Sequence, residues 1–210
     1  MQQIRQDESS LIPVQQKARF SAGSLPRGPL IAQLGSSHRP LVEAHLRSLS
    51  PADRYLRFGH AISDASISVY VRRLRFGRAA SFGAFDDAGR LLGFGHLALE
   101  PDAAEFAVSV ASHARRQGLG LAMLDRARAH ARNRGYPLLA MIYMPENRAL
   151  GALARSAGMQ MACDPAECRA YLQLEPATPE SVLREGWREA IAAIDLGFRL
   201  GATRAPLTSA

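Results

Sequence analysis

Arginine and glycine residues with the spacing of an anion-binding loop lie in the middle of the chain. Residues 111–121 read ASHARRQGLGL and contain the pattern R-x-x-G-x-G from Arg115 to Gly120. Glycines permit backbone conformations closed to other residues, and the first amides of a following helix attract anions. The pattern predicts a cradle for a phosphate or pyrophosphate. A turn without ligand has the same short pattern, so the flanking residues must decide.

The residues before the loop have the periodicity of a strand. Residues 105–110, EFAVSV, alternate so that Phe106 and Val108 share one face while Glu105 and Ser109 share the other. The loop therefore follows the end of a half-buried strand.

The residues after the loop predict a helix, a strand and a second helix. Apolar residues recur at helical spacing from 121 until Gly135, which is a typical helix stop. A strand is expected over 137–143, and Asn147 is positioned to cap a helix that Gly158 ends.

The predicted order of elements resembles that of the GNAT superfamily of acyl-CoA-dependent N-acyltransferases: a strand, an anion loop, a helix, a strand and a helix. Residues 111–121 resemble its motif A, whose amides hold the coenzyme A pyrophosphate, and residues 147–159 resemble motif B. The resemblance implies an α/β GNAT fold, with a mixed central sheet flanked by helices, and acetyl-CoA as co-substrate without a metal. The positions it implies for cofactor binding are Val108, Val110, Arg115, Arg116, Gln117, Gly118, Leu119, Gly120, Leu121 and Asn147.

Residues 50–58, SPADRYLRF, resemble the helical entry segment of the acetyltransferase domain in bacterial Pat-type protein lysine acetyltransferases. The whole resemblance covers about residues 40–175. It implies transfer to a primary amine, with a protein lysine favoured over a small-molecule amine.

The reaction needs a base for the attacking amine, and Glu105 is the candidate. It shares a strand face with Ser109 at the edge of the expected cofactor site. His96, His113 and Glu146 are the alternatives.

Many GNAT enzymes protonate the leaving thiolate with a tyrosine seven residues after the motif B asparagine. That position is Ala154 here, so Tyr143 or solvent must supply the proton. The missing tyrosine also leaves open a catalytically silent module that binds acyl-CoA.

Composition narrows the class of protein. The 210 residues are 47% hydrophobic, with no apolar run of about 20 residues and no secretory leader, so we expect a soluble cytoplasmic protein. The spacing of Cys163 and Cys168 fits neither a metal pair nor a disulfide framework, which predicts reduced thiols.

The net charge of +7 raises the question of nucleic-acid binding. Nucleic-acid binders usually cluster their charge with aromatic residues or a readable motif, whereas the arginines here are spread over many segments, so that function is not expected.

We divide the chain into a polar lead-in (1–37) with one strand near Leu30, a GNAT domain (38–175), and a C-terminal helix with its tail (176–210). Further helices are expected from Pro40, from Pro51 after a Ser50 cap, and over 64–74. Strands are expected over 79–85 and 91–99, joined by a hairpin, and in a closing pair after Gly158.

The C-terminal helix is predicted to be amphipathic. Leu183, Trp187, Ile191 and Ile194 recur at helical spacing before Gly197. We expect this face to dock on its own subunit; the alternative is contact with a partner or a homodimer.

Overall fold

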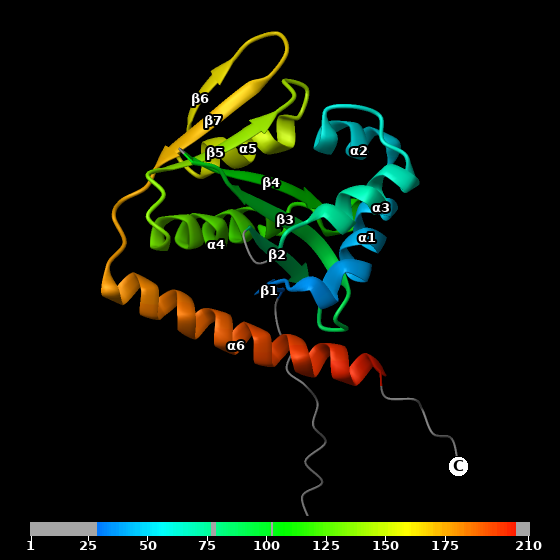
Figure 1. The fold of residues 1–210 in the computed structure, drawn as a ribbon. Helices are drawn as coiled ribbons and strands as arrows, with labels where there is room; N and C mark the ends of the chain where they lie inside the picture. The colour runs from blue at the N-terminus through cyan, green and yellow to red at the C-terminus, as the bar shows by residue number, and fades with distance from the viewer. Residues whose placement is uncertain (1–28, 77–78, 102, 205–210) are drawn as a thin grey trace, which may run out of the picture.

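A computed structural model describes residues 29–76, 79–101 and 103–204. They form a seven-stranded mixed sheet with helices on both faces and a long helix beside one edge (Figure 1). The strands are β1 (Leu30–Gln33), β2 (Ala80–Phe85), β3 (Leu91–Leu99), β4 (Ala104–Val110), β5 (Leu138–Tyr143), β6 (Gln160–Cys163) and β7 (Cys168–Gln173). The α/β fold class is confirmed, and β1 lies where a strand was expected. Residues 1–28 of the predicted lead-in and 205–210 of the tail lie outside the described residues.

Serine residues cap two of the helices, and the cap at Ser50 confirms its prediction. Ser50 accepts a hydrogen bond from the Asp53 amide at 3.1 Å, and the next residue, Pro51, begins α2. Ser63 caps α3 in the same way through the Ser66 amide. The helical elements are η1 (Ser36–His38), α1 (Arg39–Ser48), α2 (Pro51–Phe58), α3 (Asp64–Arg73), η2 (Ser112–Ala114), α4 (Leu119–Asn133), α5 (Arg148–Ser156) and α6 (Pro179–Arg204).

The sheet opens between β4 and β5. Its strand order is β1-β2-β3-β4-β5-β7-β6, and β4–β5 is its parallel pair. These two strands pair at only two positions, Ala104 with Leu139 and Glu105 with Ala140. Beyond Glu105 the edge of β4 that faces β5 has no strand partner among the described residues, so the strands diverge toward the loop that follows β4.

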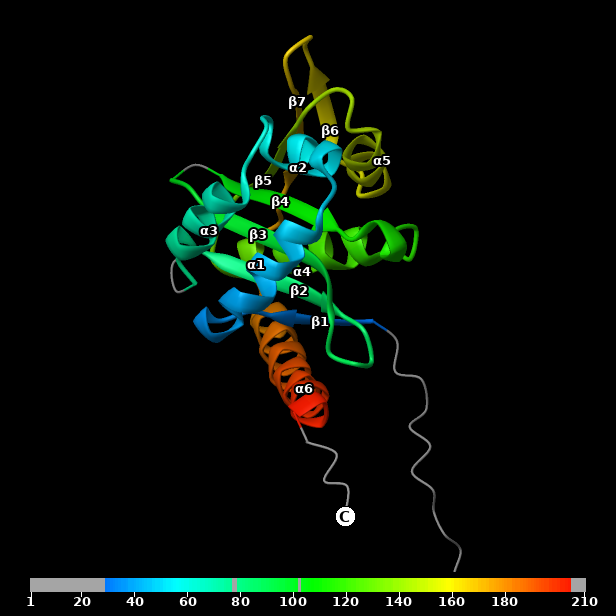
Figure 2. The same ribbon diagram turned by 90° about the vertical axis from the view of Figure 1, so that its right-hand side faces the viewer.

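Two apolar cores hold helices to opposite faces of the sheet. One packs α4, through Met123, Leu124 and Ala127, against strand residues that include Phe106. The other packs α1 and α3 on the opposite face and continues to Ala192 on α6. Figures 1 and 2 show the resulting layers, with α6 running beside the edge strand β1.

The C-terminal helix forms, but its predicted apolar face points away from the protein. Trp187 is 70% exposed and Ile194 is 63% exposed, so the expectation that these residues dock on their own subunit was wrong. The docked face instead carries Ala192 and Leu196 together with charged groups, among them Arg199, which donates to the Asp86 carbonyl at 2.9 Å. A helix has more than one face that can pack, and here buried ion pairs and small apolar residues attach it.

The cysteines form a disulfide, so the prediction of reduced thiols was also wrong. Cys163 and Cys168 are directly opposite each other in the β6–β7 register and are bonded to each other. The Asp164 side chain accepts the amides of Ala166 and Glu167 and closes the turn between them. The spacing of five residues is thus set by a tight hairpin, which brings the two sulfur atoms together.

Candidate functional site

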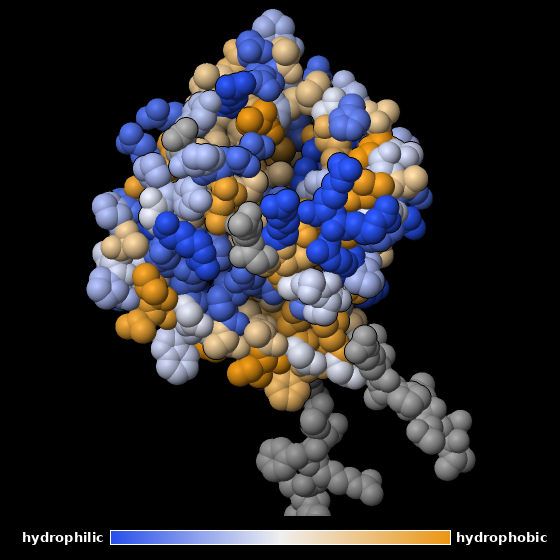
Figure 3. All heavy atoms as spheres, in the orientation of Figure 1, coloured by the Kyte–Doolittle hydropathy of each residue, from blue (hydrophilic) through white to orange (hydrophobic). Residues whose placement is uncertain are grey.

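A cleft of about 710 Å³ lies where β4 and β5 diverge. Its walls come from the end of α1, from α2, from β4 and the loop after it, and from the first turn of α4 together with α5. In Figure 3 the surface is hollowed between the regions that Figure 1 labels α5 and α2. The cleft brings together nine of the eleven predicted site residues: Val108, Val110, Arg115, Arg116, Gly118, Leu119, Gly120, Leu121 and Asn147. Glu105 and Gln117 are not among its lining residues.

The two glycines of the loop have different roles. Gly118 is the N-cap of α4 with φ of 76°, a left-handed conformation that glycine adopts without strain. Gly120 lies inside the first turn of the helix, where a Cβ would meet the Leu153 side chain at an ordinary 3.6 Å. Arg116 also has a left-handed φ, of 64°. The chain therefore turns sharply just before the helix begins.

The start of α4 directs backbone amides into the cleft. The first bond from the helix back to its cap runs from the Ala122 amide to the Gly118 carbonyl at 2.9 Å. The amides of Leu119, Gly120 and Leu121 precede it, so no helical carbonyl is available to them. These donors, together with the positive end of the helix dipole, fit a phosphate or pyrophosphate.

Arginines surround this amide cradle. Arg115 forms an ion pair with Asp53 of α2 at 2.7 Å and donates from Nε to the Val110 carbonyl at 3.2 Å. Arg116 and Arg148 also line the cleft. Arg115 thus braces the loop against α2, while the charge of all three favours an anionic ligand.

Asn147 links the two walls of the cleft. Its side-chain oxygen accepts the Leu150 amide at 3.1 Å and caps α5, as its position predicted. Its side-chain nitrogen donates to the Leu56 carbonyl of α2 at 3.4 Å. The side chain is buried and holds α5 and α2 at a fixed separation across the opening.

Glu105 lies at the vertex of the diverging strands. It is the last β4 residue that pairs with β5. Phe106 and Val108 pack toward α4, so Glu105 and Ser109 face the opposite layer, as predicted from the alternation. Ser109 is in the cleft wall, roughly 13 Å along the strand from Glu105. Glu105 therefore lies at the point where the strands part, outside the residues that line the cleft and away from the phosphate cradle.

Ser109 contacts a histidine that the sequence did not single out as a site residue. The Oγ of Ser109 lies 3.0 Å from Nε2 of His45, which is buried on α1. Burial, with a smaller contribution from the nearby guanidinium of Arg57, lowers the pKa of His45 to about 4. At neutral pH this imidazole is uncharged. The contact joins residues 64 positions apart, and no local pattern could have revealed it.

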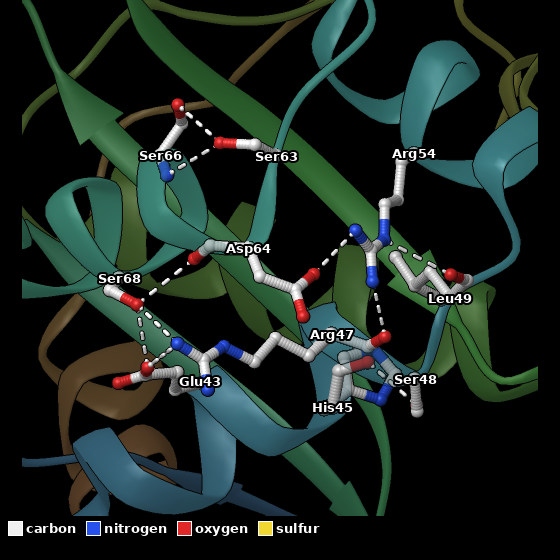
Figure 4. A network of polar contacts seen from close by, with 10 residues as sticks. All are labelled: Glu43, His45, Arg47, Ser48, Leu49, Arg54, Ser63, Asp64, Ser66 and Ser68. Carbon is white, nitrogen blue, oxygen red and sulfur yellow. Dashed lines mark hydrogen bonds and ion pairs between the residues drawn. The ribbon is translucent and has the colours of Figure 1, made fainter.

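The helical wall opposite β4 is fixed by a polar network (Figure 4). Arg54 donates to Asp64 of α3 at 2.7 Å and to the carbonyls of Arg47 and Leu49 at the end of α1. In the same network Ser68 donates to Glu43 at 2.8 Å. Arg54 of the predicted entry segment thus holds three helices together, whereas Arg57 of that segment lines the cleft.

The sequence pattern of the acetyltransferase (GNAT) family matches residues 46–159, more than half of the chain. The chain belongs to the GNAT family. The match runs from α1 through α5 and contains the diverging strands, the amide cradle and Asn147. The protein is therefore an acetyltransferase that uses acetyl-CoA.

Solved GNAT structures share the fold at low sequence identity. The GNAT domain of the S. lividans PAT protein has a TM-score of 0.59 at 19% identity, over 69% of this chain and 89% of that one. RimL, a ribosomal L7/L12 α-N-protein acetyltransferase in complex with coenzyme A, has a TM-score of 0.56 at 16% identity, over 71% and 96%. A GNAT phosphinothricin acetyltransferase from Sinorhizobium meliloti, in complex with acetyl-CoA, has 0.56 at 14%, over 72% and 94%. At these identities the likeness establishes the fold.

The other candidate groups of this GNAT enzyme lie in different environments. His96 is within 3.1 Å of Ser81, and burial lowers its pKa to about 4. His113 and Glu146 are exposed at the surface. The Tyr143 hydroxyl points to the Met161 sulfur at 3.4 Å, and Tyr143 is not among the residues that line the cleft.

The motif B position that often carries tyrosine is part of the core. Ala154 is fully buried, and Met159 at the end of the motif is also buried. A larger side chain at 154 has no space here without repacking.

Among the described residues, no helix combines the length and the apolar composition that a membrane span requires.

Proposed function

We propose that this enzyme transfers the acetyl group of acetyl-CoA to a primary amine, and that the acceptor is a lysine side chain of a protein. The observation that carries the proposal is the position of Glu105. Glu105 is the β4 residue at which β4 and β5 part, and the cleft that contains the amide cradle begins beyond this point, with Ser109 on the same strand face in its wall.

The cradle and β4 provide the binding groups for the cofactor. The amides of residues 119–121 bind the pyrophosphate, with Arg116 and Arg148 nearby in the wall. The β4 backbone beyond Glu105 offers hydrogen bonds to an extended, amide-containing arm, because it is not paired with β5 there. Acetyl-CoA supplies the activated acetyl group.

Glu105 accepts the proton of the attacking amine, directly or through water. A carboxylate positioned for this transfer contributes roughly 100-fold or more to the rate. Arg57 of α2 lines the cleft. Its guanidinium disfavours the charged ammonium form of an amine bound nearby, which makes proton loss from that amine easier.

The shape of the cleft favours a lysine on a protein. A lysine must enter with its own backbone outside, which requires an opening rather than an enclosed cavity. The cleft opens to the surface between α2 and α5 (Figure 3). The fold alone does not determine the class of acceptor. Of two structures with this fold, RimL is named for a ribosomal protein, whereas the Sinorhizobium meliloti enzyme is named for the small molecule phosphinothricin.

The experiment follows labelled acetyl-CoA in a cell lysate before and after removal of small molecules. The wild type should label lysines of a few proteins in both samples. Glu105→Gln keeps the shape of the side chain and removes its basicity, so labelling should fall roughly 100-fold while acetyl-CoA affinity is retained. Glu100→Gln is the matched control, because Glu100 is exposed after β3 and does not line the cleft, and it should label as the wild type does.

Three results would contradict parts of the proposal. Turnover that needs the small-molecule fraction would assign a metabolite acceptor. Full activity of Glu105→Gln would move the base elsewhere, with His96 and Glu146 next to test. Acetyl-CoA binding without transfer in either sample would indicate a silent binding module.

A further inference from the structure

The outer face of α6 is a row of large apolar side chains directed away from the protein. Its members are between 62% and 70% exposed: Leu183, Trp187, Ile191, Ile194 and Phe198. In Figure 3, hydrophobic atoms coloured orange gather along the lower edge of the molecule, where Figure 1 places α6. Single exposed apolar residues are ordinary, but a continuous row of this size marks a contact surface.

Four residues of the row are arranged symmetrically along the helix. Trp187, Ile191, Ile194 and Phe198 are spaced by four, three and four residues, with an aromatic residue at each end and an isoleucine pair in the centre. The spacing is that of a coiled-coil seam. Because the order reads the same from either end, the row is complementary to itself when reversed.

We propose that the outer face of α6 binds a second copy of this chain, with the two α6 helices antiparallel about a two-fold axis. In this register Trp187 packs against Phe198 of the partner subunit, and Ile191 packs against Ile194 of the partner subunit. The axis passes between Ala192 and Ala193, at the centre of the row. A two-fold contact uses the same patch on both copies, as this pattern requires.

The exposed area of the row fits a modest dimer. Its five side chains present roughly 700 Å² to solvent, so two copies would bury about 1,400 Å², within the range of specific interfaces. This area corresponds to a contact that forms and dissociates, in contrast to an obligate interface.

Small residues beside the row permit close approach of another helix. A Cβ at Gly197 or at Gly186 would meet no atom of the described residues within 4 Å outside the local helix backbone. Glycine inside a helix costs stability relative to alanine, so its presence on an open face needs a reason. Tight packing of a second helix supplies one.

The exposed arginines favour the antiparallel orientation. Arg184 and Arg188 are both exposed in the first half of α6. Parallel pairing would bring these arginines of the two copies together, whereas antiparallel pairing separates them. Asp195 adds nothing to this contrast, because its carboxylate binds Arg199 on the attached face at 3.0 Å.

The proposed contact leaves both clefts accessible. Figures 1 and 2 place α6 at one end of the molecule, beyond β1, while α2 and α5 stand at the other end. Each copy therefore keeps an open cleft directed away from the partner. The dimer does not depend on acetyl-CoA or on an acceptor.

The first experiment measures the mass of the full chain by sedimentation across the micromolar range. The wild type should be a reversible dimer. Trp187 is the single tryptophan of the chain, so its emission should shift to the red on dilution as the dimer dissociates.

The variant Ile191→Glu should raise the dissociation constant by roughly 100-fold or more, since it puts a charge in both of the central layers in which Ile191 meets Ile194 of the partner subunit. Val69→Glu is the matched control on α3, where Val69 is also exposed, and it should remain dimeric.

The second experiment tests the register by mixing two variants. Ile191→Glu and Ile194→Arg should each be monomeric alone. In an antiparallel pair of the two, one central layer joins the new glutamate to the new arginine and the other keeps both native isoleucines. The mixture should therefore recover a heterodimer of twice the monomer mass.

Three outcomes would overturn the proposal. A wild type that stays monomeric throughout the range would show that another segment or partner covers the row. A dimer unaffected by Ile191→Glu would place the contact elsewhere. Failure of the mixture to associate, with both variants folded by circular dichroism, would exclude the antiparallel register.

Discussion

The cleft and the outer face of α6 differ in how many parts of the chain build them. The cleft takes residues from α1, α2, β4, the loop after β4, α4 and α5, and contacts such as Asp53 with Arg115 join segments far apart in sequence. The outer face of α6 takes its residues from one helix, and the helix geometry alone aligns them. The first surface depends on the whole fold, while the second depends on where one helix is attached.

This difference implies that the two surfaces are energetically separate. The sheet lies between them (Figure 2), and the α6 row is not among the residues that line the cleft. A change in one region should leave the function of the other intact, because distant sites without shared partners behave additively.

The largest effect is expected at the amide cradle. Gly120→Glu places a side chain and a negative charge where the pyrophosphate would bind, and acetyl-CoA affinity should fall by about 1,000-fold, or ~4 kcal/mol. Gly120→Ala should bind nearly as the wild type, because the added Cβ meets Leu153 at 3.6 Å. Titration calorimetry measures both variants, and sedimentation should show their association unchanged. Wild-type affinity in Gly120→Glu would refute the placement of the cofactor.

Local chemistry explains what the sequence could predict about the site. The anion loop and the Ser50 and Asn147 caps depend on backbone conformations and hydrogen bonds within a few residues. Such patterns carry their own physical cause, so both caps and the turn before α4 were predicted correctly, while anion binding by the loop stays a prediction. The family match from 46 to 159 then confirmed the order in which they occur.

Long-range packing explains what the sequence could not predict. The periodicity of α6 identified an apolar face, but the direction of that face depends on what the opposite side can bind. Arg199 and Glu185 on that side form buried polar contacts with the β2–β3 turn and α4, which no periodicity reveals. The contact between His45 and Ser109 was missed for the same reason.

The next effect concerns acid stability near the cleft. Burial lowers the pKa of His45 to about 4, with Arg57 and His113 adding positive charge nearby, while an unfolded histidine titrates near 6.5. Protons therefore favour the unfolded chain below pH 6.5, and the free energy of unfolding should fall by up to about 3 kcal/mol between pH 6.5 and 4 from this group. His45→Gln should remove that part of the slope in urea unfolding measured at each pH. Ser109→Ala should keep the slope, because burial is its main cause; loss of the slope there would contradict this explanation.

A smaller effect is expected at the attachment of α6. Burial raises the pKa of Glu185, but hydrogen bonds from His130 at 2.8 Å and Asn133 at 2.7 Å outweigh it and lower the pKa to about 2. The contribution of Glu185 to the free energy of unfolding is therefore present above about pH 4.5 and is lost as the pH falls toward 2. This pH range lies below the range from 6.5 to 4 in which His45 acts. Glu185→Gln should lower the free energy of unfolding at pH 7 by about 2 kcal/mol. Urea unfolding measures it, and a cost that persisted unchanged at pH 2 would contradict the assignment to this carboxylate.

The smallest effect separates the open face of α6 from its attached face. Gly197→Ala replaces a glycine within the helix, and the added Cβ would meet nothing within 4 Å outside the local helix backbone. The free energy of unfolding should therefore rise by about 0.5–1 kcal/mol through helix propensity alone. The measurement belongs in the Ile191→Glu background, because there association does not add to stability. In the wild-type background the same methyl group stands beside the proposed two-fold contact and should weaken the dimer. Destabilisation in the monomeric background would mean that the face is covered by another part of the protomer, and the difference between the two regions would then disappear.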